Sequence, residues 1–531
     1  MARTRAWMPL LLLLPVVLSP ALGAAGAKSS KGHELPPIVF VSRAPLPDSL
    51  RGQVPGLGPH GTFAGAGGRL LERGSDGRVR ELVPAGRLFD VADPDVSDDG
   101  TRVAFSARER AGSPWRIWVV QRSLAQRVGE EPLACATCDE PGGADPGDDA
   151  DPTWWGDTLI YVSTRGVEQA RSLYDRTPAT QLWVRTPDGR RAIVTHEPNG
   201  VLDPVPDQGR THLLFARWWF NPWHADPAGG VTRATMSAAD SVNLWQVVSA
   251  RLVRGVDGRL RLDDVRLAAG GTVPRRSGMG LQPEPLPQGG IVAVATHNMG
   301  LAPRPGTLAL VRYKDPPSPG RRLAGAAIGD ESGDPYTEAA NLRAPAACAP
   351  AALDDGRIVC ALDPGGNGDF GLWLLDARGD PVAALVDSVG ALELDPAPVP
   401  THGREREASA KPDGSREVIS QPGEAPTFRY FNTDVFGSKG DAARIEGARL
   451  NVYRLDPSGT LLLIQQAPVP RKGRVDLRLP AEAPLFEMLV GPDGVALTSA
   501  HGLAQVRGFN IGAHGATSRC SGCHLGHSPS P

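Results

Sequence analysis

The residues with the clearest chemical potential lie near the C-terminus, in the sequence Cys520-Ser-Gly-Cys523-His524. Two thiols separated by two residues can form thioether bonds to both vinyl groups of a haem, and the adjacent imidazole can ligate the iron. The sequence therefore predicts one covalently attached c-type haem, with Cys520 and Cys523 as attachment residues and His524 as an iron ligand.

The same segment allows two other chemistries. With His527, it reads Cys-x-x-Cys-His-x-x-His, which offers four ligands that Zn²⁺ accepts. A surface disulfide between Cys520 and Cys523 is the second alternative. Haem is favoured because a histidine directly follows the second cysteine and because the N-terminus, described below, predicts export to a compartment where c-type haem can be attached.

The second axial ligand of the iron stays open at the level of sequence. An open or water-filled position is allowed, and the candidate side chains are His514, His527, His224, His297 and Met299. Because the motif lies so close to the end of the sequence, we expect the preceding domains to supply the walls of the haem pocket.

The other four cysteines predict disulfide bonds. Cys348 and Cys360 are symmetric about Asp354 in a predicted hairpin, so a bridge between opposed strands is expected; two buried thiols are the alternative. Cys135-Ala-Thr-Cys138 is not followed by histidine and has no βαβ context, which favours a local loop disulfide.

The first 27 residues are typical of a signal peptide. Two arginines precede an apolar run over residues 8–18, and small residues follow up to an Ala-Gly-Ala sequence at 25–27. An N-terminal membrane anchor is the alternative, but the run is shorter than the ~20 residues of a membrane span and contains Pro15. We therefore expect a periplasmic or secreted protein without stable membrane insertion.

Composition narrows the class of function further. The 531 residues carry 56 Lys plus Arg against 59 Asp plus Glu, a net charge of −3, and no long basic run, which argues against a nucleic-acid partner. The 63 glycines and 51 prolines have no collagen period and indicate many turns. No G-x-S-x-G or H-E-x-x-H sequence is present, which argues against a hydrolase of either type.

A repeat of about sixty residues organises the middle of the chain. Each unit begins with Asp-Pro or a related pair, followed by a turn and an alternating strand. The pairs begin at Asp93, Asp151, Asp203, Gln282 and Ala349, and a last pair at Asp395 has no strand of that type after it.

A second sequence motif, a tryptophan after leucine or isoleucine, recurs at the same spacing. The tryptophans of four Leu-Trp or Ile-Trp pairs, at 118, 183, 245 and 373, are 65, 62 and 128 residues apart, and the missing member falls near residue 309. Six units of short strands predict an all-β, six-bladed propeller over residues 28–402, whose repeats resemble those of TolB-type propellers. We expect the tryptophans to fill the wedges between blades.

Segments inserted after the second strand of several units are expected to meet on one rim of the propeller. They contain Arg217, Trp218, His224 and His297, and the first three lie in the aromatic sequence 217–224. Such residues are favoured at binding hot spots. The alternative is that they plug the central channel or seat the C-terminal domain.

The remaining chain divides into three parts. Residues 403–426 are polar and aperiodic and predict a linker. Residues 427–512 contain alternating strands and predict a small antiparallel β-sandwich. Residues 513–531 form the predicted haem-attachment tail.

This layout resembles the alpha chain of hydrazine synthase and its relatives. The shared features are the signal peptide, the propeller with its Arg-Trp-Trp-Phe sequence (217–220), the sandwich with Leu-Pro-Ala-Glu-Ala-Pro-Leu-Phe (479–486), and Cys-x-x-Cys-His. The resemblance implies haem attachment at Cys520 and Cys523 and a role for His524 as the motif histidine. It also implies a redox partner or further subunits of a periplasmic complex.

Two functions follow as expectations. The first is electron transfer or small-ligand chemistry at a single haem packed against the propeller, as a c-type cytochrome-like protein or a subunit of a haem-dependent oxidoreductase. Hydrazine synthesis itself is not expected, because the family's alpha chain continues into a second haem-bearing domain and this sequence has one motif. The alternative is a periplasmic interaction scaffold with zinc or a disulfide at the C-terminal cysteines.

Overall fold

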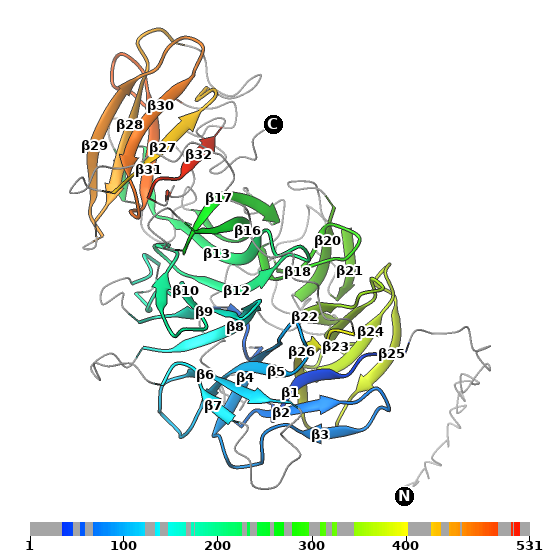
Figure 1. Ribbon diagram of the computed structural model, residues 1–531. Helices are drawn as coiled ribbons and strands as arrows, with labels where there is room; N and C mark the ends of the chain where they lie inside the picture. Colours follow the sequence, from blue (N-terminus) through cyan, green and yellow to red (C-terminus); the bar gives the residue numbers. More distant parts are fainter. Residues whose placement is uncertain are drawn as a thin grey trace, which may run out of the picture. The chain divides into compact units, whose positions relative to one another are not determined.

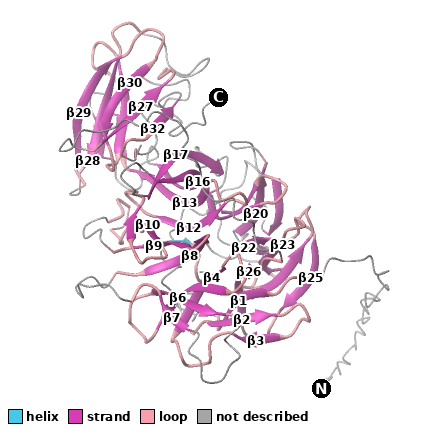
Figure 2. Cartoon of the chain, in the orientation of Figure 1, coloured by secondary structure: helices cyan, strands magenta, loops and turns pink. Residues whose placement is uncertain are grey.

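The computed structural model describes a chain whose named elements are all β-strands (Figures 1 and 2). The described residues are 34–45, 54–58, 67–122, 133–138, 147–165, 171–174, 176–225, 231–233, 242–254, 260–269, 279–296, 308–314, 321–325, 345–401, 426–436, 445–456, 459–497, 511–512 and 514–520. The chain divides into the units Met1–Leu35 and Pro36–Pro531. The predicted signal peptide and all of the predicted linker except Pro426 lie outside the described residues.

Six four-stranded antiparallel sheets form the predicted six-bladed propeller. Blade 1 contains β26 (Leu392–Pro398), β1 (Ile38–Arg43), β2 (Arg69–Arg73) and β3 (Val79–Glu81). Blade 2 contains β4 (Asp90–Val96), β5 (Arg102–Arg108), β6 (Arg116–Gln121) and β7 (Leu133–Cys135). Blade 3 contains β8 (Asp149–Trp155), β9 (Thr158–Ser163), β10 (Gln181–Arg185) and β11 (Arg191–Ile193).

Blades 4 to 6 repeat the pattern. Blade 4 contains β12 (Val201–Pro206), β13 (Leu213–Asn221), β16 (Val242–Arg254) and β17 (Leu260–Ala269). Blade 5 contains β18 (Met279–Pro285), β19 (Ile291–Thr296), β20 (Leu308–Tyr313) and β21 (Arg321–Gly325). Blade 6 contains β22 (Ala346–Ala352), β23 (Ile358–Asp363), β24 (Gly371–Leu375) and β25 (Pro381–Val386).

The ring is closed by strands from opposite ends of the propeller sequence. β26, which contains the last Asp-Pro pair, runs antiparallel to β1, with Ile38 opposite Pro398 and Ser42 opposite Glu393. The strand that the repeat lacked after Asp395 is therefore β1, some 350 residues earlier in the chain. Closure matters because it removes the open sheet edges that an incomplete ring would expose.

The Asp-Pro position adopts the same unusual backbone in every blade. Its φ is positive, at 43° to 53°, for Asp93, Asp151, Asp203, Gln282, Ala349 and Asp395. The ladder register shifts at each of these places, which marks a β-bulge. Aspartate tolerates this left-handed conformation better than most residues, which explains why it occupies four of the six positions.

The bulge turns each of these residues toward the next blade. The Asp151 carboxylate accepts a hydrogen bond from the backbone N–H of Asp203 (3.2 Å), and Asp203 accepts one from Gln282 (2.8 Å). The Gln282 carboxamide oxygen accepts from the N–H of Ala349 (2.8 Å). Asp395 accepts from the N–H of Asp93. We call this set of six residues the axial belt.

The repeated tryptophans lie where the sequence predicted. Trp118 packs with residues of blades 1 and 2, and Trp183 packs with residues of blades 2 and 3. Trp245 and Trp373 belong to or contact the largest apolar cluster, and Ala309 on β20 takes the fifth position. Since such rings fill the space between twisted sheets, they hold neighbouring blades together.

The C-terminal strands form two three-stranded sheets around a shared core. One sheet has the order β30 (Val475–Pro480), β27 (Thr427–Asn432), β32 (Thr517–Cys520); the other has the order β29 (Leu461–Pro468), β28 (Arg449–Leu455), β31 (Leu485–Val490). Apolar residues from both sheets form one cluster, as expected for a sandwich. The strands of the predicted sandwich, residues 427–512, pair antiparallel as expected, and β32, from the segment predicted to be a tail, adds to β27 in parallel.

The prediction of a Cys348–Cys360 disulfide is wrong. Both residues are buried free thiols, which was the alternative. The bulge at Ala349 shifts the ladder so that Cys348 lies opposite Ala361, while Cys360 pairs with Trp373 on the other neighbour. The symmetric spacing in the sequence did not account for the extra residue.

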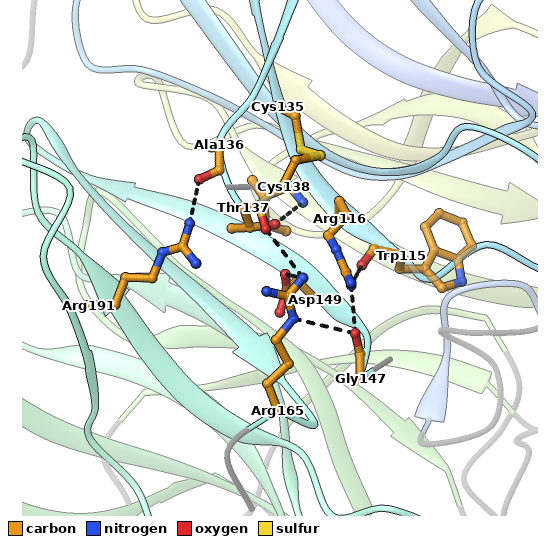
Figure 3. The surroundings of a disulfide bond; sticks show 11 residues. Trp115, Arg116, Cys135, Ala136, Thr137, Cys138, Gly147, Asp149, Arg165 and Arg191 are labelled. Atoms are coloured by element: carbon orange, nitrogen blue, oxygen red, sulfur yellow. Dashed lines mark hydrogen bonds and ion pairs between the residues drawn. A yellow bond between two sulfur atoms is a disulfide. The ribbon is translucent and has the colours of Figure 1, made fainter. Parts of the chain in front are cut away.

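A disulfide joins Cys135 and Cys138, as predicted, with 5.5 Å between the Cα atoms (Figure 3). The loop that it closes is tied to its surroundings. The Thr137 hydroxyl accepts a hydrogen bond from the backbone N–H of Ile117 (3.0 Å), and the Ala136 carbonyl accepts one from the Arg191 guanidinium (3.1 Å). The bridge thereby fixes a loop that orients Arg191 of the next blade.

The axial belt also concentrates negative charge around a channel cavity of about 190 Å³. Burial raises the pKa of Asp151, Asp203 and Asp395 from 3.8 to about 7, and the mutual repulsion of the carboxylates adds to the shift. The pKa of Asp93 is raised as well, mainly by burial, against the opposing effect of Arg43. Neutral carboxyl groups therefore form part of the folded state up to near-neutral pH.

Stability is expected to fall as the pH rises from about 4 to about 7. The folded carboxyls have raised pKa values, so the folded state binds more protons than the unfolded chain in this range, and their contribution is lost as the pH rises through about 7. Asp151→Asn keeps the acceptor for Asp203 but cannot ionise. It should reduce the fall by roughly 1–3 kcal/mol, measured by urea unfolding at several pH values.

The matched control is Asp380→Asn, which changes an exposed aspartate and should keep the full pH dependence of the parent chain. An unchanged pH dependence in Asp151→Asn would show that the belt does not carry this titration.

Candidate functional site

A cavity of about 500 Å³ lies between the outer strands of blades 3 and 4 and the segment that precedes β32. Its volume falls within the roughly 300–1,000 Å³ of typical small-molecule sites. We call it the junction cavity. Its lining residues are Trp183, Arg191–Glu197, Phe215, Leu260–Leu262, Val265, Glu482, Ile511, Gly512 and His514.

The propeller wall of the junction cavity is held by a buried glutamine. The Gln181 carboxamide donates to the carbonyl of Glu197 (2.7 Å) and accepts from the Glu197 backbone N–H (2.8 Å) and the Thr195 hydroxyl (2.9 Å). Thr195 in turn accepts from the backbone N–H of Leu182 (2.8 Å). Thr195 and Glu197 are buried, whereas His196 between them is partly accessible and lines the cavity.

Burial and a nearby carboxylate have opposite effects on the pKa of His196. Burial lowers the pKa of His196, and the Glu482 carboxylate, which lines the same cavity, opposes this shift. A lowered pKa keeps the imidazole neutral at neutral pH, so one ring nitrogen has a free lone pair. A neutral imidazole can accept a proton or ligate a metal.

The opposite wall comes from the C-terminal domain. Gly512 packs so closely against the Phe428 ring that a Cβ at this position would overlap with it. The Gly512 carbonyl accepts a hydrogen bond from the backbone N–H of Glu482 (2.8 Å), and the N–H of Gly515 donates to Thr427 (2.9 Å). His514 lies between these two anchors and lines the cavity.

β32 continues from this wall toward the cysteine motif. It pairs in parallel with β27, with Thr517 opposite Arg429 and Cys520 opposite Asn432. Cys520, which we assigned to a tail, is therefore the last residue of a sandwich strand. Cys523, His524 and His527 lie outside the described residues.

The segment 217–224 is not the loop that we expected. Arg217, Trp218 and Phe220 lie on β13, which pairs with β16 up to Asn221, and His224 belongs to the short hairpin of β14 (Trp223–Ala225) and β15 (Val231–Arg233). Trp218 is 1 % exposed and stacks on Trp245, with 5.6 Å between ring centroids. Three consecutive aromatic residues, Trp218, Trp219 and Phe220, are buried along this strand, so the sequence belongs to the propeller core rather than to a binding rim.

Arg217 is buried in an ion pair behind the junction cavity. Its guanidinium lies 3.5 Å from the Glu197 carboxylate, donates to Gln246 (3.2 Å) and lies over the Trp219 ring. Burial raises the pKa of Glu197, and Arg217 offsets part of that increase. Arg217 therefore supports the cavity wall from inside the propeller and does not line the cavity itself.

Among the predicted iron ligands whose side chains the structure describes, His514 lines the junction cavity. His297, Met299 and His527 lie outside the described residues, and for His224 only the backbone is described. The sequence analysis missed His196, Arg191 and Arg261, which line the same cavity. No spacing signal marks them, because they come from separate outer strands and a connecting segment.

Two general properties complete the description of the described residues. No group of three or more His, Cys, Asp or Glu side chains is arranged to hold a metal ion within that part of the chain. No helix in it is long and apolar enough to cross a membrane.

Comparison with known proteins supports the fold. No family model matches the sequence, and no curated protein sequence matches it. Among solved structures, hydrazine synthase from Kuenenia stuttgartiensis is similar with a TM-score of 0.59 at 12% identity, covering 92% of this chain and 69% of that chain. The β-propeller domain of the Trilobed protease from Pyrococcus furiosus has a TM-score of 0.32 at 11% identity, covering 60% and 74%. At such identities, the first likeness establishes an all-β propeller fold.

Removing Arg217 should destabilise the propeller. Arg217→Met leaves Glu197 buried without its cationic partner, which costs roughly 3–5 kcal/mol in comparable buried pairs. The free energy of unfolding, measured with urea, should fall accordingly.

The double variant Arg217→Met/Glu197→Gln removes both charges and should recover most of the loss. If Arg217→Met unfolds at the same urea concentration as the parent chain, the ion pair does not support this wall.

Proposed function

We propose that this chain is an exported monohaem protein of the c-type cytochrome kind, which transfers electrons or binds a small ligand at a haem packed against a β-propeller. The sequence Cys520-Ser-Gly-Cys523-His524 carries the proposal, with the two thiols as attachment points and His524 as an iron ligand. The N-terminal sequence supports export. The likeness in fold to hydrazine synthase supports kinship with that protein's propeller-bearing chain.

The junction cavity suits such a group. Its walls combine apolar side chains, including Ile193, Leu262 and Val265, with two histidines and two arginines. A porphyrin needs an apolar enclosure, imidazole ligands for the iron and cations for its carboxylates, so the donor set fits.

The attachment site is also close enough to the cavity. Cys520 lies six positions after His514, and an extended chain of that length spans at most roughly 20 Å. β32 holds four of these residues in a sheet, so Cys520 has a fixed position relative to the cavity wall.

The protein's part in the chemistry follows from these residues. The bound haem would supply a one-electron redox step or an open coordination position for a small ligand. The apolar walls would exclude water, and the imidazoles and guanidiniums that line the cavity would set the reduction potential through ligation and charge. A redox protein or further subunits of an exported complex would be the partner.

Replacing both motif cysteines should abolish covalent haem. The chain is expressed with a cytochrome-maturation system, and Cys520→Ala/Cys523→Ala should lose all haem staining on a denaturing gel, because no thiol remains to form thioether bonds. The matched control, Cys348→Ala/Cys360→Ala, removes two buried thiols elsewhere and should keep the stain.

A wild-type chain without covalent haem contradicts the proposal. Stoichiometric zinc in such a chain, measured by elemental analysis, would favour the scaffold alternative in which the two cysteines, His524 and His527 hold the metal.

A further inference from the structure

The junction cavity has two walls that come from different parts of the chain. His196 and Arg191 belong to the propeller wall, which is fixed by Gln181 and by the disulfide loop. His514 belongs to the C-terminal wall, six residues before Cys520. The arrangement brings one histidine to each side of a single cavity.

Hydrogen bonds fix the backbone on both sides of His196. Thr195 and Glu197 are buried, with hydrogen bonds to Leu182 and Gln181, and Glu197 lies beside Arg217 inside the propeller. His196, between them, is partly accessible and lines the cavity. Glu482 is the carboxylate that faces His196 across the cavity.

We propose that His196 is the second axial ligand of the haem iron. This inference rests on the proposed function and deepens it. The two axial ligands of a haem lie on opposite faces of the porphyrin. The motif supplies one ligand from the C-terminal segment, and His514 comes from that same segment, so the ligand for the other face comes from the propeller wall. Among the described propeller residues that line the cavity, His196 is the histidine.

Two arginines define the polar side of the same site. Arg191 and Arg261 line the junction cavity from β11 and β17. Guanidinium groups bind carboxylates with paired hydrogen bonds, so these two side chains are suited to the haem propionates. One carbonyl, that of Ala136, already orients Arg191 (3.1 Å).

The full-length chain, matured with haem, tests the assignment by spectroscopy. The wild-type ferric protein should be low-spin with two histidine ligands, as read by electron paramagnetic resonance and the visible spectrum. His196→Ala should become high-spin while keeping covalent haem, and added imidazole should restore the low-spin signal. His196→Met should stay low-spin, with a raised reduction potential, because methionine ligation raises it.

His212→Ala is the matched control, because it removes an accessible propeller histidine that does not line the cavity. It should keep the wild-type spectrum. A low-spin spectrum of unchanged potential in His196→Ala and His196→Met, with haem attached, overturns the assignment and leaves the proposed function standing. A wild-type chain that fails to stain for haem overturns both.

Discussion

The propeller depends on one repeated hydrogen bond at its axis. A side-chain oxygen of one blade accepts the backbone N–H of the equivalent residue in the next, as Asp203 does from Gln282. The bond requires a bulge and a positive φ, which expose the N–H on the inner strand instead of pairing it within the blade. Between Asp93 and Asp151 the Ser106 hydroxyl relays the same link. Ala349 has no side-chain acceptor, so the belt is interrupted between blades 6 and 1.

This geometry has an electrostatic cost, because it gathers carboxylates in a place with little water. The folded protein reduces the cost by keeping protons on the group, which is what the raised pKa values of Asp151, Asp203 and Asp395 express. Arg217 and Glu197 meet the same difficulty differently, by pairing opposite charges. The axis can therefore couple stability to pH, whereas at the wall of the junction cavity Arg217 offsets part of the rise that burial causes in the pKa of Glu197.

The sequence predicted those features that repeat locally and missed those that depend on register or distant pairing. Two sequence motifs that recur at the same spacing were enough to predict six blades, because each blade is a short stretch of consecutive strands. Closure by β26 and β1 was invisible, since the partners lie at opposite ends of the propeller sequence. The extra residue of one bulge misled the pairing of Cys348 with Cys360. Arg217 looked like a binding residue because composition does not distinguish an aromatic rim from a buried strand. His196 carried no signal because it lies in a connecting segment and meets the other cavity residues only in the fold.

On the proposed function, a haem attached at Cys520 would need little affinity of its own for the junction cavity. A ligand tethered near its site binds as an intramolecular partner, at an effective concentration that reaches millimolar for short linkers. With the first attachment cysteine fixed at the end of β32 by pairing with Asn432, that tether would be short and partly rigid. A few side chains would then suffice for orientation: an imidazole from the propeller wall, a pair of guanidiniums, and apolar surfaces between them. On the proposed function, the sandwich would deliver the group and the propeller would set its electronic properties, through side chains on the outer strands of blades 3 and 4 and on the segment that follows β11.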